Sequence, residues 1–233
     1  MSRVIKEDFK ELCSFIDKYD MSHILSEDEA KRMFSSCHKK YYAFLLIIEE
    51  FRTLCAAKAV FIGPKQYSYL QESCSDVGQA FFMTINGCYK GAKLLLRSSI
   101  ENFLKGVCFD EDNTIVSTKN VYEVFDKASA SNVFSSYTSL HERLHNEYAT
   151  LCKDVHTSDK YHMEAITALS HFPAFDKTKC KEVQDCLQRL LSTFITVLSL
   201  KYNEEYHKIN YAGKEILNRE IIKSFRKVVQ NIE

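Results

Sequence analysis

The length, composition and charge of this 233-residue chain exclude several classes of protein. With 6 Gly and 2 Pro, the chain lacks the turn residues that a β-rich fold needs about every 8–12 residues, so long helices are the economical interpretation. The 31 basic and 31 acidic residues cancel. Overall charge therefore does not attract the chain to nucleic acid or to an anionic membrane, and an RNA contact would need a local basic patch.

The N-terminal segment, the short apolar runs and the cysteines of the sequence predict a cytoplasmic protein. The N-terminal MSRVIKEDFKEL alternates charged and apolar residues, unlike a signal peptide, and the most apolar run, 41–48, is far shorter than the roughly 20 residues of a membrane span. The nine Cys residues are an odd set without CxxC spacing, and most lie among apolar residues. We therefore expect a reducing cytosol, no disulfide partner and no membrane partner.

Apolar residues recur at helical spacing along most of the chain, and polar or Gly/Pro-containing stretches separate the helical segments. The expected helices, in order, are 4–19, 26–61, 65–85, 89–109, 121–128, 132–156, 176–207 and 214–231. Ser26-Glu-Asp-Glu29 reads as a capping box, Gly63-Pro64 ends a helix, and Asn86-Gly87 breaks or weakens one. Loops are expected at 110–120 and 157–160, with a break at 171–175. Because the sequence shows no repeat or linker, we predict one domain over 1–233, an all-α multi-helix bundle.

The helix expected over 89–109 carries an i,i+4 pair, Arg97 and Glu101, opposite a broad apolar arc. Three apolar residues share the side of the pair: Leu94, Leu104 and Cys108. One interpretation is a surface ion pair. The other is a charged pair in a half-apolar cleft or second interface, where Arg97 would hold a phosphate bidentately and Glu101 would orient it. Near the apolar arc, Gly91 and Gly106 predict close approach of a neighbouring helix.

The helix expected over 132–156 carries a stripe of potential ligands and bases. At about 100° per residue, four side chains fall close together and face inward: His141, His145, Cys152 and His156. Core packing explains this stripe as well as a function does. If it is functional, Cys152 and His156, spaced i,i+4, could pair as nucleophile and base.

A second interpretation of the stripe is a zinc site. His141-Glu-Arg-Leu-His145 spells HExxH, the zincin motif in which two imidazoles on one helix face bind zinc and the Glu is the general base. Glu164 is the candidate third ligand. Charged Arg143 and Glu147 at positions that are usually uncharged, and the lack of a preceding β-sheet, weigh against a zinc metallopeptidase.

Two segments resemble a known family. Tyr148-Ala-Thr-Leu-Cys-Lys-Asp-Val-His-Thr-Ser158 resembles the helix-ending Tyr-x-x-Leu-Ser/Cys-x-x-Val-His-x-Ser of bacterial HEPN-like helical proteins. Gly87-x-Tyr89-x-x-Ala92, leading into Leu96-Arg97-Ser98-x-x-Glu101, resembles the helix that precedes it there. The resemblance covers about residues 66–160. It implies an antiparallel, often dimeric helical bundle, with a HEPN-like core at about 66–208 and N-terminal helices at 4–61 packed on it.

Many HEPN proteins are metal-independent RNases of toxin–antitoxin and phage-defence systems, with an Arg-x4-His motif at the dimer cleft. Here the motif is degenerate, because Leu151 and Cys152 stand where the Arg would precede His156. The departure leaves open whether the chain cleaves RNA or is a non-catalytic protein-interaction or sensor subunit of a defence complex.

The resemblance implies a substitute for the missing arginine. His156 would act as general acid and base, Arg97 from the neighbouring helix would stabilise the phosphate charge, and two further residues would orient them, Glu101 and Tyr148. The expected partners are RNA and either a second copy of the chain or a protein of a defence complex. No cofactor is expected.

Overall fold

The computed structural model of the protein describes residues 10, 14, 18–20, 24, 27–56, 62–153 and 172–232. The described residues form helices joined by turns and contain no strand, which confirms the predicted all-α class. None of the described helices combines the length and apolar character needed to cross a membrane. Of the helix predicted over 4–19, only residues 10, 14, 18 and 19 are among those described, and the capping serine Ser26 lies outside them.

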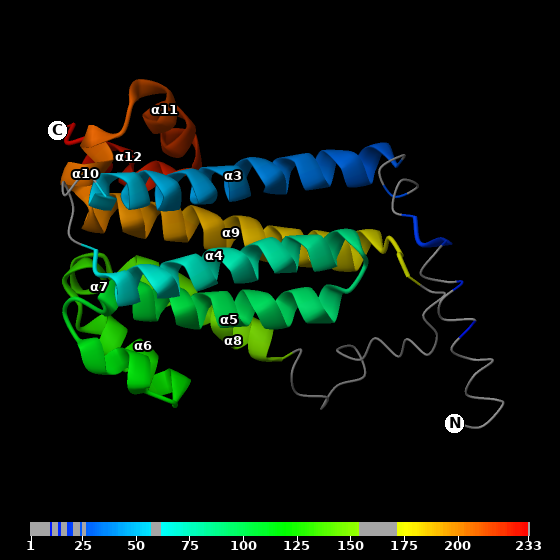
Figure 1. The fold of residues 1–233 in the computed structure, drawn as a ribbon, viewed down its shortest axis with the longest axis horizontal. Helices are drawn as coiled ribbons and strands as arrows, with labels where there is room; N and C mark the ends of the chain where they lie inside the picture. The colour runs from blue at the N-terminus through cyan, green and yellow to red at the C-terminus, as the bar shows by residue number, and fades with distance from the viewer. Residues whose placement is uncertain are drawn as a thin grey trace.

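Among the described residues, four long helices form the body of the molecule (Figure 1): α3 (Asp28–Ala56), α4 (Pro64–Ile85), α5 (Tyr89–Cys108) and α9 (Lys177–Lys201). Helix α5 packs against α4 and α9, and α3 also packs against both. At their junction the ring of Phe194 stacks on Phe103 with centroids 4.0 Å apart, and Phe44 contacts it at 5.5 Å. These long helices therefore share one apolar core.

Shorter elements surround this body. The short helices α6 (Val121–Ser129) and α8 (Thr138–Cys152) pack against α5. The remaining short elements among the described residues are α7 (Asn132–Ser136), α10 (Asn203–Lys208), α11 (Tyr211–Glu220), α12 (Arg226–Val229) and the 3-10 turns at Asn113–Ser117 and Lys223–Phe225. Figure 1 shows α10, α11 and α12 gathered at one end of the long helices. The predicted loop at 110–120 thus contains a 3-10 turn. The side chain of Asp112 caps this turn by accepting a hydrogen bond from the backbone N–H of Thr114.

Three predicted helices are interrupted in the structure. The helix expected over 132–156 breaks at Tyr137 (φ −129°, ψ 63°), and the one expected over 176–207 breaks at Tyr202 (φ −111°, ψ 49°). The one expected over 214–231 starts earlier, at Tyr211, and ends at Glu220 before an extended Ile221 (ψ 136°). These predictions of continuous helices were wrong in length, although each segment is helical on both sides of its break.

Contacts made across the molecule explain two of these breaks. The Tyr202 hydroxyl accepts a hydrogen bond from Gln66 of α4 (2.9 Å), and Asn203 donates to the carbonyl of Val229 (2.8 Å). After α11, the backbone N–H of Ile222 donates to the hydroxyl of Thr196 (3.1 Å). Near Tyr137 the local sequence Ser-Ser-Tyr-Thr-Ser disfavours a continuous helix, and the hydroxyl of Ser135 donates to the backbone carbonyl of Asn132 (3.2 Å).

Glycines let α4 and α5 approach one another. A Cβ atom at Gly106 would lie 2.8 Å from the side chain of Leu70, so the close approach predicted there is confirmed. At Gly91 a Cβ would meet only Met83 at an ordinary 3.8 Å, so no close approach occurs there. The turn between α4 and α5 contains Gly87 at φ +75°, where a Cβ would overlap the carbonyl oxygen of Ala174. The helix break predicted at Asn86-Gly87 is therefore confirmed.

Replacing Gly87 by Ala is expected to lower the free energy of unfolding by about 2 kcal/mol or more, because a left-handed backbone conformation and a backbone overlap both oppose the new methyl group. Urea unfolding followed by circular dichroism would measure the loss. Gly91→Ala is the matched control, since Ala is favoured inside a helix and has room there. Equal midpoints for the two variants would contradict this account of the turn.

Candidate functional site

Three of the four residues predicted to form the site meet between α5 and α8. The Nε–H of Arg97 donates to the Tyr148 hydroxyl (2.8 Å), and that hydroxyl donates to Oε1 of Glu101 (3.0 Å). Nη2 of Arg97 lies 3.7 Å from the same Glu101 oxygen. The guanidinium carbon also lies 5.0 Å from the centroid of the Tyr148 ring. We call these residues the Arg97–Tyr148–Glu101 cluster.

The two helices position the cluster at the edge of the core. Arg97 and Glu101 are one helical turn apart on α5, and their side chains are 31% and 27% exposed. Tyr148 belongs to the buried face of α8, together with Leu140, Leu144 and Leu151. The cluster is thus half-buried, which favours the prediction of a charged pair in a half-apolar cleft over that of a freely solvated surface pair.

The surroundings fix the protonation states in the cluster. Burial, helped by the negative charge of Glu101, raises the pKa of Tyr148 well above its usual value, although the hydrogen bond from Arg97 opposes this. Burial acts to lower the pKa of Arg97, but the hydrogen bond to Tyr148 and nearby negative charge outweigh it and raise that pKa. At neutral pH the tyrosine therefore stays protonated and donates a hydrogen bond to Glu101. It can orient its neighbours but cannot act as a base.

The predicted acid–base residue, His156, lies outside the described residues, as does Glu164, the third ligand of the zinc alternative. Cys152, the proposed nucleophile of the Cys–His alternative, is half-buried in the last turn of α8. The roles of His156 and Glu164 stay predictions. Within the described ranges, no group of three or more His, Cys, Asp or Glu side chains could hold a metal ion.

His141 and His145 face inward only in part, since both rings pack on the buried ring of Phe125 but are not themselves buried. Both are half-buried and line a surface pocket of about 440 Å³ between α6 and α8, which we call the α6–α8 pocket. Its walls include Tyr122, Phe125, Asp126, His141, Glu142 and His145. The core face of α8 is turned toward its leucines instead, because burying an imidazole would require partners for its polar nitrogens. His141 finds one partner at the pocket wall, the Phe125 carbonyl, which accepts from Nε2 at 2.9 Å.

Glu147 of α8 does not lie freely in solvent. Its side chain is 15% exposed and pairs with Arg189 of α9, whose Nη2 donates to Oε2 at 3.0 Å. This ion pair joins two helices far apart in the sequence, a contact that a helical wheel of α8 alone does not contain.

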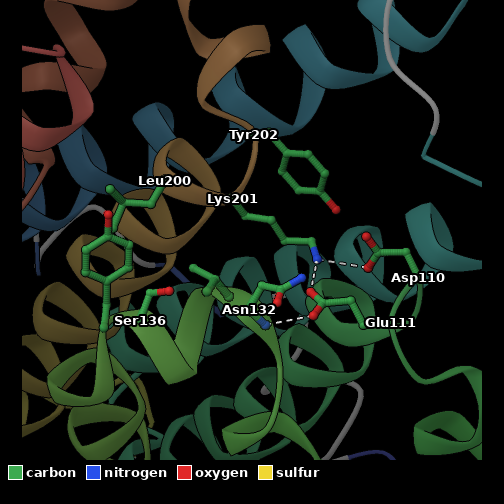
Figure 2. A pocket seen from close by; sticks show the side chains of 9 residues that line it. Asp110, Glu111, Asn132, Ser136, Leu200, Lys201 and Tyr202 are labelled. Atoms are coloured by element: carbon green, nitrogen blue, oxygen red, sulfur yellow. Dashed lines mark hydrogen bonds and ion pairs between the residues drawn. The ribbon is translucent and has the colours of Figure 1, made fainter.

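A second polar pocket, of about 370 Å³, surrounds Lys201 at the end of α9 (Figure 2). The ammonium group lies between two carboxylates, 2.9 Å from Asp110 and 2.7 Å from Glu111, and its side chain is only 8% exposed. Glu111 also accepts from the backbone N–H of Asn132 (2.7 Å). Burial favours the uncharged forms, but these bonds outweigh it, so the pKa of Lys201 is raised and that of Glu111 is lowered. This ion-pair network ties α9 to the loop after α5 and to α7.

Replacing Lys201 by Met is expected to lower the free energy of unfolding at neutral pH by about 1–2 kcal/mol, because Asp110 and Glu111, which remain in contact with solvent, would lose the buried cation that they share. Since the lowered pKa of Glu111 stabilises the fold only above the unfolded value of about 4.3, the deficit should shrink as the pH falls through that range. Urea unfolding at several pH values would measure it. Lys31→Met, at an exposed position of α3, is the control. A deficit that persists in acid would contradict the assignment.

No protein-family model, curated protein or solved structure matches the chain. The candidate site is therefore defined by its own geometry. Two features were not predicted from the sequence: Phe125, whose ring centroid lies 5.4 Å from that of Tyr148, and the Lys201 network. The acidic Asp110-Glu111 pair after a predicted helix was the available signal for that network, but nothing in the sequence paired it with Lys201.

Proposed function

We propose that the chain is a HEPN-like antiparallel bundle of a bacterial defence or toxin–antitoxin system that binds RNA and cleaves it without a metal ion. The proposed reaction centre is the Arg97–Tyr148–Glu101 cluster, in a cleft completed by a second copy of the chain. The observation that carries the proposal is that these residues converge from α5 and α8, with Arg97 and Glu101 partly exposed and Tyr148 buried between them.

The geometry of Arg97 supports phosphate binding. Its Nε–H is committed to Tyr148, and the contact of Nη2 with Glu101 is long at 3.7 Å. The outer guanidinium nitrogens therefore keep hydrogens for two oxygens of a phosphate, the fork geometry in which arginine binds phosphate best. Tyr148 and Glu101 act as positioning residues, because they hold the guanidinium in one orientation before the substrate binds.

RNA supplies its own nucleophile for this reaction. The ribose 2′-hydroxyl gives its proton to a base and its oxygen attacks the adjacent phosphorus. The bond from phosphorus to the 5′-oxygen breaks, and that oxygen takes up a proton, leaving a 2′,3′-cyclic phosphate and a 5′-hydroxyl. Because the phenol of Tyr148 holds its proton, we assign the proton transfers to His156 and the stabilisation of the phosphorane charge to Arg97.

One observation favours the alternative of a non-catalytic interaction subunit. Arg97 and Glu101 already neutralise each other, and the chain as a whole carries no net charge. In that role the cluster would join α5 to α8, and the function would lie in the surface that a partner protein covers.

Cleavage of end-labelled single-stranded RNA by the full-length protein, in buffer containing EDTA, distinguishes the two. The wild type is expected to produce fragments ending in 2′,3′-cyclic phosphate. His156→Ala should lose at least about 100-fold in rate, since it lacks the proton-transfer group. His38→Ala, at an exposed position of α3, should cleave like the wild type. Absence of cleavage by the wild type, or full cleavage by His156→Ala, would overturn the proposed mechanism.

A further inference from the structure

The α6–α8 pocket has walls made largely of flat rings. Tyr122 is 69% exposed at its rim. Deeper in, the ring of Phe125 makes edge contacts with His141 and His145, with centroids 5.6 Å and 5.1 Å apart. Phe125 is buried and forms the floor of the pocket, whereas the exposed ring of Tyr122 can present its π face to a planar or cationic group.

Acceptors without partners surround these rings. The carboxylates of Asp126 and Glu142 line the pocket, are exposed, and make no hydrogen bond or ion pair with any other residue that the structure describes. The hydrogen bond from Nε2 of His141 to the Phe125 carbonyl places the proton of a neutral ring on Nε2. Nδ1 of that ring is consequently a further acceptor.

The local charge of the pocket is negative. No Lys or Arg is among its lining residues within the described part of the chain. Lys127, the neighbour of Asp126 in sequence, has its ammonium group 3.2 Å from Asp112 instead. Two unpaired carboxylates beside aromatic rings attract cations and repel phosphate groups.

We propose that the α6–α8 pocket binds a guanidinium group, presented by an arginine side chain of a partner or by a free guanidinium compound. A guanidinium has a planar fork of donors for the carboxylates and a flat face that stacks on aromatic rings, whereas an ammonium is a compact point charge. This inference does not depend on RNA cleavage, because it uses neither Arg97 nor His156. The pocket adjoins the Arg97–Tyr148–Glu101 cluster, because the ring of its residue Phe125 contacts the ring of Tyr148.

Titration of the full chain with acetyl-arginine amide, followed by the NMR signals of the aromatic side chains, tests the proposal. Acetyl-citrulline amide is the matched ligand, because it has the same shape without the charge. A short arginine-containing peptide forms the second arm. Tighter binding of the peptide than of the amide assigns the pocket to a partner's arginine, and equal binding assigns it to a small guanidinium compound.

Saturable shifts of the Tyr122 and Phe125 signals are expected with the arginine amide, and binding of the citrulline amide should be at least about tenfold weaker. Glu142→Gln and Asp126→Asn should each weaken the arginine amide by about tenfold. Glu123→Gln, an exposed carboxylate of α6 outside the pocket, should leave binding unchanged. Equal binding of both amides, or an equal loss of binding in Glu123→Gln, would overturn the proposal. A separate titration with nucleoside monophosphates should leave these signals unchanged, and shifts produced by them but not by the arginine amide would also overturn it.

Discussion

RNA cleavage by the Arg97→Ala variant is expected to be about 10²–10³-fold slower than cleavage by the wild type. Arg97 is the cation of the Arg97–Tyr148–Glu101 cluster, and its guanidinium is already oriented by Tyr148 when the substrate arrives. In the proposed mechanism, removing it takes away the charge that stabilises the transition state and leaves Glu101 to repel the phosphate. Initial rates on labelled RNA under single-turnover conditions measure the effect.

Two further variants separate this effect from a general loss of positive charge. Arg219 forms the same kind of i,i+4 pair, with Glu215, but its side chain is 71% exposed on α11. Arg219→Ala should therefore cleave RNA at the wild-type rate. Arg97→Lys should recover only part of the rate, because lysine keeps the charge and loses the fork. Equal rates for Arg97→Ala and Arg219→Ala would contradict the assignment of the cluster.

Phe194→Ala is expected to lower the free energy of unfolding by about 3–5 kcal/mol. Phe194 is fully buried where three long helices meet, stacked on Phe103 at 4.0 Å and close to Phe44 at 5.5 Å. The truncated side chain would leave a cavity that rings from two other helices line and cannot easily fill. Urea unfolding followed by far-UV circular dichroism measures the loss.

Phe82→Ala is the matched control for this prediction. Phe82 lies on α4 with 57% of its surface exposed, so its truncation should change the free energy of unfolding by about 0.5 kcal/mol or less. If Phe194→Ala and Phe82→Ala unfold at the same urea concentration, the core does not lie where α3, α5 and α9 meet.

The helices themselves could be predicted because their signals are local. Apolar residues repeat at helical spacing, and the dipeptide Asn86-Gly87 is a typical turn signal. In the structure Gly87 adopts the left-handed backbone conformation that such a turn uses. The breaks at Tyr202 and after Glu220 were missed because distant partners make them. Gln66 binds the Tyr202 hydroxyl, and Thr196 binds the freed N–H of Ile222.

The candidate site could be predicted only in part for a similar reason. The i,i+4 spacing places Arg97 and Glu101 on one side of α5, and the family resemblance drew attention to Tyr148. The rotation of α8 about its own axis depends on which face packs against α5 and α9, and a helical wheel does not contain that information. His141 and His145 were therefore expected inside, and they lie at a surface pocket whose floor is the buried Phe125.

The salt dependence of RNA binding tests most directly whether Arg97 contacts a phosphate. For a single strand, the slope of log K against log salt is about −0.7 for each phosphate that a cation neutralises. Binding of a 2′-O-methyl RNA, which lacks the attacking hydroxyl, can be measured for the wild type, Arg97→Ala and Arg219→Ala. We predict that the slope becomes shallower by about 0.7 in Arg97→Ala and is unchanged in Arg219→Ala. The same slope in all three proteins would contradict the proposed RNA site.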